Sequence, residues 1–350
     1  MTERVSTGIL SSKHRHGMVA LVVASAVLVF AAGCAQKGSP VEVEDGTGGY
    51  RIVGTLAIAG YAEDVEVDGS LCVLAAGQGG LVFVDVSDPA NPEYLSTGAT
   101  SYPAMGCAYV ASDSLAFAAI GAQGIYVYDV SDLLNPVWQS NGQGIFTRDV
   151  VTREVTPGDY HEVLTADGYG IRTQECYYYE GLETSWFFRQ ADDEGAAGVA
   201  RGICSRGNLA LLAIEELGLS IYDVTDVSNV LHLGGVDTPG EARAAVAEGD
   251  YVYVADWRAG LQVVDISDPS SPEIVASADT DGMADGIAYR DGKVYVAAHT
   301  GGLRVFDVTD PTNPRAAGFL ETPFANNVFV TGSNVYVADR DWGLVVAEEE

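Results

Sequence analysis

Three arginines recur at equivalent positions of successive repeats, and they are the residues most suited to bind a ligand. Aligning the repeats on the phrase Ala-x-Asp-Val places seven residues in one column: Glu63, Met105, Arg148, Arg201, Arg243, Asp285 and Asn326. Guanidinium groups form paired hydrogen bonds with carboxylates and phosphates. The column therefore predicts a binding site for an anionic ligand in which Met105 has no polar role. The alternative is that the arginines pair internally with Glu63 and Asp285 in a wet channel.

No catalytic or metal site can be assembled from the other polar residues, and we expect no cofactor. His161, His232 and His299 fall in different repeats and strand positions, so their spacing gives neither a metal cluster nor a Ser-His-Asp arrangement. Recurrent Asp pairs suggest calcium, because hard cations bind oxygen ligands, but each pair lacks the further oxygens that a site needs. We expect these residues to cap turns: Asp85, Asp88, Asp265, Asp268, Asp307 and Asp310.

Five cysteines are present, of which Cys34 lies before the repeats. Disulfides persist in oxidising compartments, and four cysteines allow three connectivities. Cys72 and Cys107 lie on predicted strands of successive repeats, as do Cys176 and Cys204. We therefore predict two disulfides, Cys72–Cys107 and Cys176–Cys204, with four buried thiols as the alternative.

The elements that position these residues are seven repeats. A glycine begins the third predicted strand of each repeat, and successive glycines are 41 to 48 residues apart: Gly80, Gly124, Gly170, Gly218, Gly260, Gly302 and Gly343. This period is close to that of propeller blades. One repeat divides into four strands, 284–289, 293–298, 302–308 and 315–320, with Asp-Pro and Asn-Pro turns between the last two. The sequence therefore predicts an all-β fold, a seven-bladed β-propeller.

The last repeat, residues 325–347, supplies only three strands. Residues 50–58 precede the first repeat and have the pattern of a strand. We predict that this N-terminal strand completes the last blade and closes the ring, which leaves no open sheet edge. The third repeat lacks the Asp-Pro turn and is rich in Tyr, Trp and Phe over 177–188. These aromatic residues predict a longer hairpin packed on neighbouring blades, or else an exposed platform for a partner.

Three runs resemble the LVIVD repeat of bacterial and archaeal surface proteins. They are LVFVD at 81–85, LQVVD at 261–265 and LRVFD at 303–307, each followed by Val or Ile, then Ser or Thr, then Asp-Pro. The resemblance covers residues 50–347. It implies a β-propeller of mostly unassigned function, and it implies no set of catalytic residues.

The N-terminus has the layout of an export signal. Basic residues at 13–16 precede the apolar run 18–32, which is short for a membrane-spanning helix. The end of the run, FAAGC, resembles the lipobox of bacterial lipoproteins, which implies that Cys34 is lipidated. We predict a lipoprotein signal peptide over 1–33, a polar tether over 34–49 and a propeller over 50–350. Plain secretory cleavage is the alternative.

The chain is strongly acidic, with 18 Lys and Arg against 49 Asp and Glu and a formal net charge of −31. Such a field repels nucleic acid and anionic lipid headgroups. We expect a solvated acidic surface, with binding of cations or basic partners as the alternative.

These features together predict a lipid-anchored protein of the cell envelope, in the outer membrane or at the cell surface. We expect a monomer whose propeller binds a small anionic ligand or a protein partner and does not bind nucleic acid. One alternative is a propeller enzyme, a lyase or hydrolase with its site at the channel mouth. Another is a purely structural surface protein.

Overall fold

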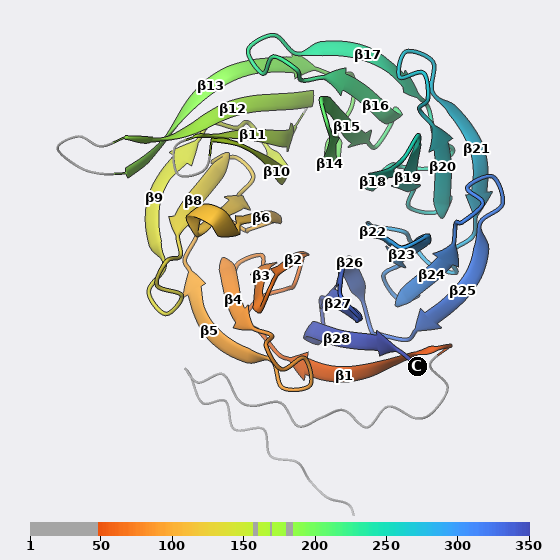
Figure 1. Ribbon diagram of the computed structural model, residues 1–350, viewed down its shortest axis with the longest axis horizontal. Coiled ribbons are helices and arrows are strands. Elements are labelled where there is room, and N and C mark those ends of the chain that lie inside the picture. Colours follow the sequence, from red (N-terminus) through yellow and green to blue (C-terminus); the bar gives the residue numbers. More distant parts are fainter. Residues whose placement is uncertain (1–47, 157–159, 169, 180–184) are drawn as a thin grey trace, which may run out of the picture. The chain divides into compact units, whose positions relative to one another are not determined.

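The computed structural model describes residues 48–156, 160–168, 170–179 and 185–350. They form seven four-stranded antiparallel sheets arranged around a central axis, so the predicted seven-bladed β-propeller is confirmed (Figure 1). The helical structure assigned to these residues is one short 3-10 turn, η1 (Ala111–Asp113). In the same part of the chain no helix is long and apolar enough to span a membrane. The predicted signal peptide and most of the tether lie outside the described residues.

Each blade runs from an inner strand near the axis to an outer strand at the rim (Figure 1). Blade 1 comprises β2 (Asp64–Asp68), β3 (Leu71–Ala75), β4 (Leu81–Asp85) and β5 (Glu93–Gly98). Blade 2 comprises β6 (Gly106–Val110), β7 (Leu115–Ala119), β8 (Ile125–Asp129) and β9 (Val137–Gly142). Blade 3 comprises β10 (Thr147–Thr156), β11 (Tyr160–Asp167), β12 (Gly170–Tyr179) and β13 (Ser185–Gly195). Blade 4 comprises β14 (Ala200–Arg206), β15 (Leu209–Ile214), β16 (Gly218–Asp223) and β17 (Leu231–Val236).

The remaining three blades follow the same plan. Blade 5 comprises β18 (Ala244–Glu248), β19 (Tyr251–Ala255), β20 (Leu261–Asp265) and β21 (Glu273–Ala278). Blade 6 comprises β22 (Gly286–Arg290), β23 (Lys293–Ala297), β24 (Leu303–Asp307) and β25 (Arg315–Leu320). Blade 7 comprises β26 (Ala325–Thr331), β27 (Asn334–Asp339), β28 (Gly343–Glu349) and, from the N-terminus, β1 (Tyr50–Leu56).

Blade 6 shows why these residues form strands. Val, Tyr and Ile suit a pleated surface, and the central strands β23 and β24 are buried on both faces because a blade packs between two others. Arg290 pairs with Lys293, which leaves a two-residue Asp291-Gly292 turn. Both turn residues have positive φ, 50° and 78°, as the tightest hairpins require.

The core consists of apolar clusters between successive blades. Along β3, Val73 packs towards blade 2, whereas its neighbours Cys72 and Leu74 pack towards blade 7. This alternation follows from the two-residue period of a strand. Residues at odd and even positions along such a strand therefore contact different neighbouring blades.

The ring closes through β1, which pairs antiparallel with β28 from Tyr50–Glu349 to Leu56–Leu344, as predicted. Tyr50 is buried in the cluster between blades 6 and 7, where its ring lies edge-on to Tyr295 at 6.1 Å. A Cβ at Gly318 would approach that Tyr50 ring to 2.7 Å. The N-terminal strand therefore supplies core packing as well as backbone pairing.

The recurrent Asp residues cap turns, as predicted. Asp265 accepts a hydrogen bond from the Ser267 N–H at 2.8 Å, and Asp268 accepts one from the Ser270 N–H at 3.0 Å. The Ser267 N–H lowers the pKa of Asp265, and the Ser270 hydroxyl, followed by the Ser270 N–H, lowers the pKa of Asp268. The same N–H bonds occur in the other intact repeats, at Asp85, Asp88, Asp307 and Asp310.

The aromatic run of blade 3 lies in a long hairpin, β12–β13, that extends beyond the neighbouring blades (Figure 1). Phe188 packs edge-on against Phe117 of blade 2 at 6.3 Å. Tyr177 is 37 % exposed. The hairpin prediction is therefore confirmed for Phe188, whereas the side chains of Tyr179, Trp186 and Phe187 lie outside the described residues.

Candidate binding site at the channel mouth

All seven residues of the predicted column line one cavity of about 140 Å³ in the central channel: Glu63, Met105, Arg148, Arg201, Arg243, Asp285 and Asn326. Each lies at the start of its blade's inner strand or directly before it, so the ring brings the seven positions to one level. We call this arrangement the channel-mouth site. The structure brings the seven residues together, and their role in binding stays a prediction.

Positive and negative residues occupy opposite sides of the site. The three arginines belong to β10, to β14 and to the residue before β18, which are neighbours on one side of the ring (Figure 1). Glu63 and Asp285 directly precede β2 and β22, which flank β26 on the other side. The alternative was that the arginines pair with Glu63 and Asp285. No ion pair joins either acid to these arginines among the described residues, so this pairing is wrong.

Arg201 and Arg243 share the carboxylate of Glu215, a residue that the sequence analysis missed. The Arg243 Nη1 lies 2.9 Å from Glu215 Oε1, and Arg201 pairs with the same oxygen. Arg243 also pairs with Glu241, which is 53 % exposed, and its Cζ lies 4.1 Å from the centre of the Trp257 ring. Two of the three arginines are therefore held in place by protein carboxylates.

Arg148 differs from its two neighbours. It has no ion-pair partner among the described residues, and its closest described aromatic contact is Phe146, whose ring centre lies 5.1 Å from Cζ. The buried Nε–H of Arg148 has no acceptor within that part of the chain. Burial, followed by the positive charge of Arg201, lowers the pKa of Arg148. The site therefore contains one guanidinium with no ion pair among the described residues, and Glu215 only favours its charge from a greater distance.

On the acidic side, Asp285 pairs with His299, and Glu63 is held by Asn326. The Asp285 Oδ2 lies 3.0 Å from His299 Nε2. Asn326 donates to Glu63 Oε2 at 3.3 Å and to the Ala62 carbonyl at 2.8 Å. Burial, and next the charge of Asp285, raise the pKa of Glu63. This side therefore holds two acids close enough to repel each other.

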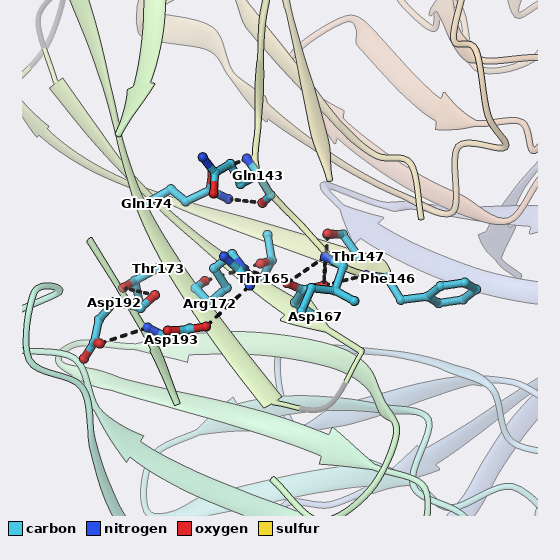
Figure 2. Close-up of polar contacts among 11 residues, drawn as sticks. Gln143, Phe146, Thr147, Thr165, Asp167, Arg172, Thr173, Gln174, Asp192 and Asp193 are labelled. Atoms are coloured by element: carbon cyan, nitrogen blue, oxygen red, sulfur yellow. Dashed lines mark hydrogen bonds and ion pairs between the residues drawn. The ribbon is translucent and has the colours of Figure 1, made fainter. Parts of the chain in front are cut away.

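A buried carboxylate fixes the loop that leads to Arg148 (Figure 2). Asp167, at the end of β11, accepts hydrogen bonds from the N–H groups of Ile145 and Phe146 at 2.9 and 2.8 Å. Arg172 donates its Nε–H to the same carboxylate at 2.6 Å. Because β10 begins directly after this loop, these bonds set the position of Arg148.

The same device recurs in blades 5 and 7. Asp256 accepts from the Gly240 N–H at 2.8 Å, in the loop that leads to Arg243. Asp339 accepts from the Phe324 N–H at 2.9 Å, in the loop that leads to Asn326. Buried carboxylates thus position three of the seven column residues.

A second ring of residues follows the second strand of each blade: Gly77, Gly121, Gly168, Glu215, Trp257, His299 and Arg340. Blades 1 to 3 have glycine at this turn, whereas blades 4 to 7 have larger side chains. Glu215, Trp257 and His299 contact column residues, as described above. A sequence signal could have identified them. The turn after the second strand has glycine in blades 1 to 3, and the larger residues that replace it in blades 4 to 7 all lie at the same height along the channel.

Trp257 and His299 adopt left-handed backbone conformations with φ of 49° in both cases. Their counterparts Gly77 and Gly121 have φ of 53° and 60°. Backbone bonds to the next blade hold the conformation: the Trp257 N–H donates to the Ala284 carbonyl at 3.0 Å and the Ala284 N–H donates back at 3.0 Å. A side chain at such a position costs roughly 1–2 kcal/mol, and such strain clusters at functional sites.

Next to the column residues, carboxylates join the inner strands of neighbouring blades, and two of them, Asp64 and Asp149, also line the cavity. Asp64 accepts from the Cys107 N–H at 2.8 Å, and Asp149 accepts from the Ile203 N–H at 2.9 Å. Glu66 accepts from the Tyr109 N–H at 2.8 Å. Burial raises the pKa of Glu66 to about 8 and that of Asp149 to about 7. These acids satisfy backbone donors on the inner strands of blades 2 and 4, which gives them a structural role.

The predicted disulfides are wrong, because all four cysteines of the propeller are free thiols. Cys72 packs between blades 7 and 1, whereas Cys107 packs between blades 1 and 2 and donates its thiol to the Val73 carbonyl at 3.6 Å. Cys176 packs between blades 2 and 3, whereas Cys204 packs between blades 4 and 5. In each predicted pair, the side chains face different neighbours, so the alternative of four thiols holds.

Comparison with sequence families detects LVIVD repeats at residues 59–100, 239–280, 281–322 and 324–347. These segments coincide with blades 1, 5, 6 and 7. Blades 2 to 4 depart from the repeat where their third strands and turns are altered. No curated protein matches the chain in sequence.

Solved structures of similar fold are related only distantly in sequence. The WD40 β-propeller domain of Doa1 has 12% identity and a TM-score of 0.62, over 87% of this chain and 98% of that one. A protein of unknown function from Desulfotomaculum acetoxidans has 15% identity and a TM-score of 0.59, over 76% and 88%. The computationally designed Ika8 protein has 12% identity and a TM-score of 0.57, over 82% and 83%. The chain is thus a seven-bladed β-propeller that carries LVIVD repeats in blades 1, 5, 6 and 7.

Proposed function

We propose that this propeller is a binding module whose channel-mouth site holds a small anionic ligand. The observation that carries the proposal is the charge imbalance on the arginine side. Three guanidinium groups face one partly buried carboxylate, Glu215, and one exposed carboxylate, Glu241, while Arg148 has no ion-pair partner in the described residues. A buried donor without an acceptor is uncommon in folded proteins. A ligand oxygen at Arg148 would supply the missing acceptor.

The geometry supports a small ligand with a carboxylate or phosphate group. Guanidinium forks bind both groups through two parallel hydrogen bonds. The cavity of about 140 Å³ is close in size to an engineered cavity of about 150 Å³ that accepts benzene. A ligand, or a ligand headgroup, of about six non-hydrogen atoms therefore fits the site.

The left-handed residues Trp257 and His299 also support a binding role for the channel-mouth site. Trp257 packs on Arg243, and His299 packs on Trp257 with ring centres 4.7 Å apart. Both occupy left-handed positions at which blades 1 and 2 have glycine. Two large side chains at strained positions next to the column are expected of a binding site, because the fold alone is satisfied by glycine.

The test is a thermal melt of the wild type and of Arg148→Gln with small carboxylates and phosphates. Arg148 is preferable to Arg201, because replacing Arg201 would break its pair with Glu215. We expect at least one anion to stabilise the wild type and to bind Arg148→Gln about 1.5–3 kcal/mol more weakly. Arg51→Gln, at an exposed ion pair on β1, is the matched control and should bind normally. If no anion stabilises the wild type, the proposal is wrong.

We further propose that the protein is exported and anchored to the cell envelope through lipid on Cys34. The support is the sequence of the N-terminal segment: a basic stretch, the apolar run 18–32 and the lipobox-like FAAGC. Mass spectrometry of protein from its native membrane should show an acylated Cys34 as the first residue. A mature chain that begins elsewhere without lipid would contradict the anchor and leave the binding proposal unaffected.

A further inference from the structure

Around one cavity, the channel-mouth site has a positive pole without an ion pair among the described residues and a negative pole that is only partly balanced. Arg148 is the positive pole, as described above. Glu63 and Asp285 form the negative pole, and both line the cavity with Arg148. The described residues contain no ion pair between the poles.

The negative pole is only partly balanced by nearby cations. His299 is engaged with Asp285 at 3.0 Å. The Arg340 Cζ lies 4.9 Å from the Tyr61 ring centre and 5.0 Å from that of Phe324. Arg340 and His299 both favour the charged form of Glu63, yet neither forms an ion pair with it among the described residues. Glu63 therefore keeps the capacity to bind a further cation.

Asn326 adds a hydrogen-bond acceptor to the negative pole. Its amide nitrogen donates to Ala62 and to Glu63, so the amide oxygen is the group left to accept a hydrogen bond. An ammonium group has three N–H donors and no acceptor. Two carboxylates and one amide oxygen match that set of donors in number and in charge.

We propose that the ligand of this site is a zwitterion, with its carboxylate or phosphate on Arg148 and its ammonium group on Glu63 and Asp285. This inference rests on the proposed anion site and names the class of ligand. A singly charged ligand would desolvate the opposite pole without pairing it, which is unfavourable. A zwitterion pairs both poles at once. The small cavity restricts the spacer between the two charges to a few carbon atoms.

The test is a calorimetric titration of the full chain with matched sets of three probes. Each set contains an ω-amino acid, from glycine to 6-aminohexanoate, with the carboxylic acid and the primary amine of the same carbon number. We expect one ω-amino acid to bind at least about tenfold more tightly than both matched probes, which corresponds to one added charged hydrogen bond. The spacer length of the tightest binder then measures the distance between the poles.

Two variants assign the poles. Glu63→Gln should bring the affinity of the ω-amino acid down to that of the carboxylic acid, and it should not weaken the carboxylic acid. Arg148→Gln should weaken both probes. Ligand-free melts check that the variants fold, and Asp285→Asn replaces Glu63→Gln if the latter does not.

The outcomes separate the two proposals. If the carboxylic acid binds as tightly as every ω-amino acid, or if the advantage survives Glu63→Gln, the zwitterion inference is wrong and the anion site stands. If neither the acids nor the amino acids bind, the zwitterion inference is wrong, and the thermal melts with carboxylates and phosphates decide the anion site. If only the amines bind, and Arg148→Gln has no effect, the zwitterion inference is likewise wrong.

Discussion

Replacing Trp257 with glycine and, in a second variant, with alanine measures the strain at the channel mouth. Both substitutions remove the indole ring and its contact with Arg243. The two variants differ only by a Cβ atom on a backbone whose φ is 49°. Comparing them cancels the lost contacts and leaves the cost of a side chain in the left-handed region.

The expected magnitude follows from two opposing effects. A Cβ in the left-handed region costs roughly 1–2 kcal/mol. Glycine loses more backbone freedom on folding, which favours alanine by about 0.4–1 kcal/mol at an ordinary position. The strain is larger, so we expect Trp257→Gly to be more stable than Trp257→Ala by about 1 kcal/mol. The backbone bonds between Trp257 and Ala284 prevent the chain from relaxing out of this conformation.

The assay is equilibrium unfolding in urea, with a thermal melt in which the two variants should differ by about 2 °C. The matched control is Arg258, the next residue, which is exposed and has no positive φ. There, Arg258→Ala should be more stable than Arg258→Gly. If Trp257→Ala exceeds Trp257→Gly in stability by as much as Arg258→Ala exceeds Arg258→Gly, the position is not strained and its use as a sign of function is refuted.

Three further predictions concern the scaffold. Deleting β1 (Tyr50–Leu56) unpairs β28 and removes Tyr50 from the core, so the melting temperature should fall by several degrees or the protein should aggregate; an unchanged melt would mean that the ring closes without β1. Burial raises the pKa of Glu66 to about 8 in the folded protein, so the folded state holds this proton more tightly and stability should fall as the pH rises from about 5 to 8. Glu66→Gln should flatten that slope, and an equally steep slope in the variant would contradict the assignment. Unfolding without reductant should leave every propeller cysteine open to alkylation, whereas a cross-linked peptide in the mass spectrum would contradict the free thiols: Cys72, Cys107, Cys176 and Cys204.

The column could be predicted from the sequence because equivalent positions of the repeats occupy equivalent positions in the blades. A residue at one offset from the inner strand occupies the same level in every blade, so alignment alone brought Arg148 and Glu63 to one cavity. The pairing of their neighbours could not be predicted in this way. Glu215 lies after the second strand of an altered repeat, and only the folded ring shows that it lies between Arg201 and Arg243.

The disulfide error has a specific cause. Placing Cys72 and Cys107 on neighbouring blades was right, but neighbouring strands do not imply facing side chains. Val73 faces blade 2, and so Cys72, one residue earlier, faces blade 7. Alternation along the strand was visible in the sequence, whereas the blade that each face contacts depends on the sense in which the ring is wound.

The central claim is that Arg148 binds an anionic group at the channel mouth. The most direct measurement is a crystal structure of the protein with the anion that gives the largest thermal shift. We predict density for the anion in the cavity, with its oxygens within hydrogen-bonding distance of the guanidinium groups of Arg148 and Arg201, and no such density in Arg148→Gln. Density that persists unchanged in the variant, or an anion bound only outside the channel, would contradict the claim.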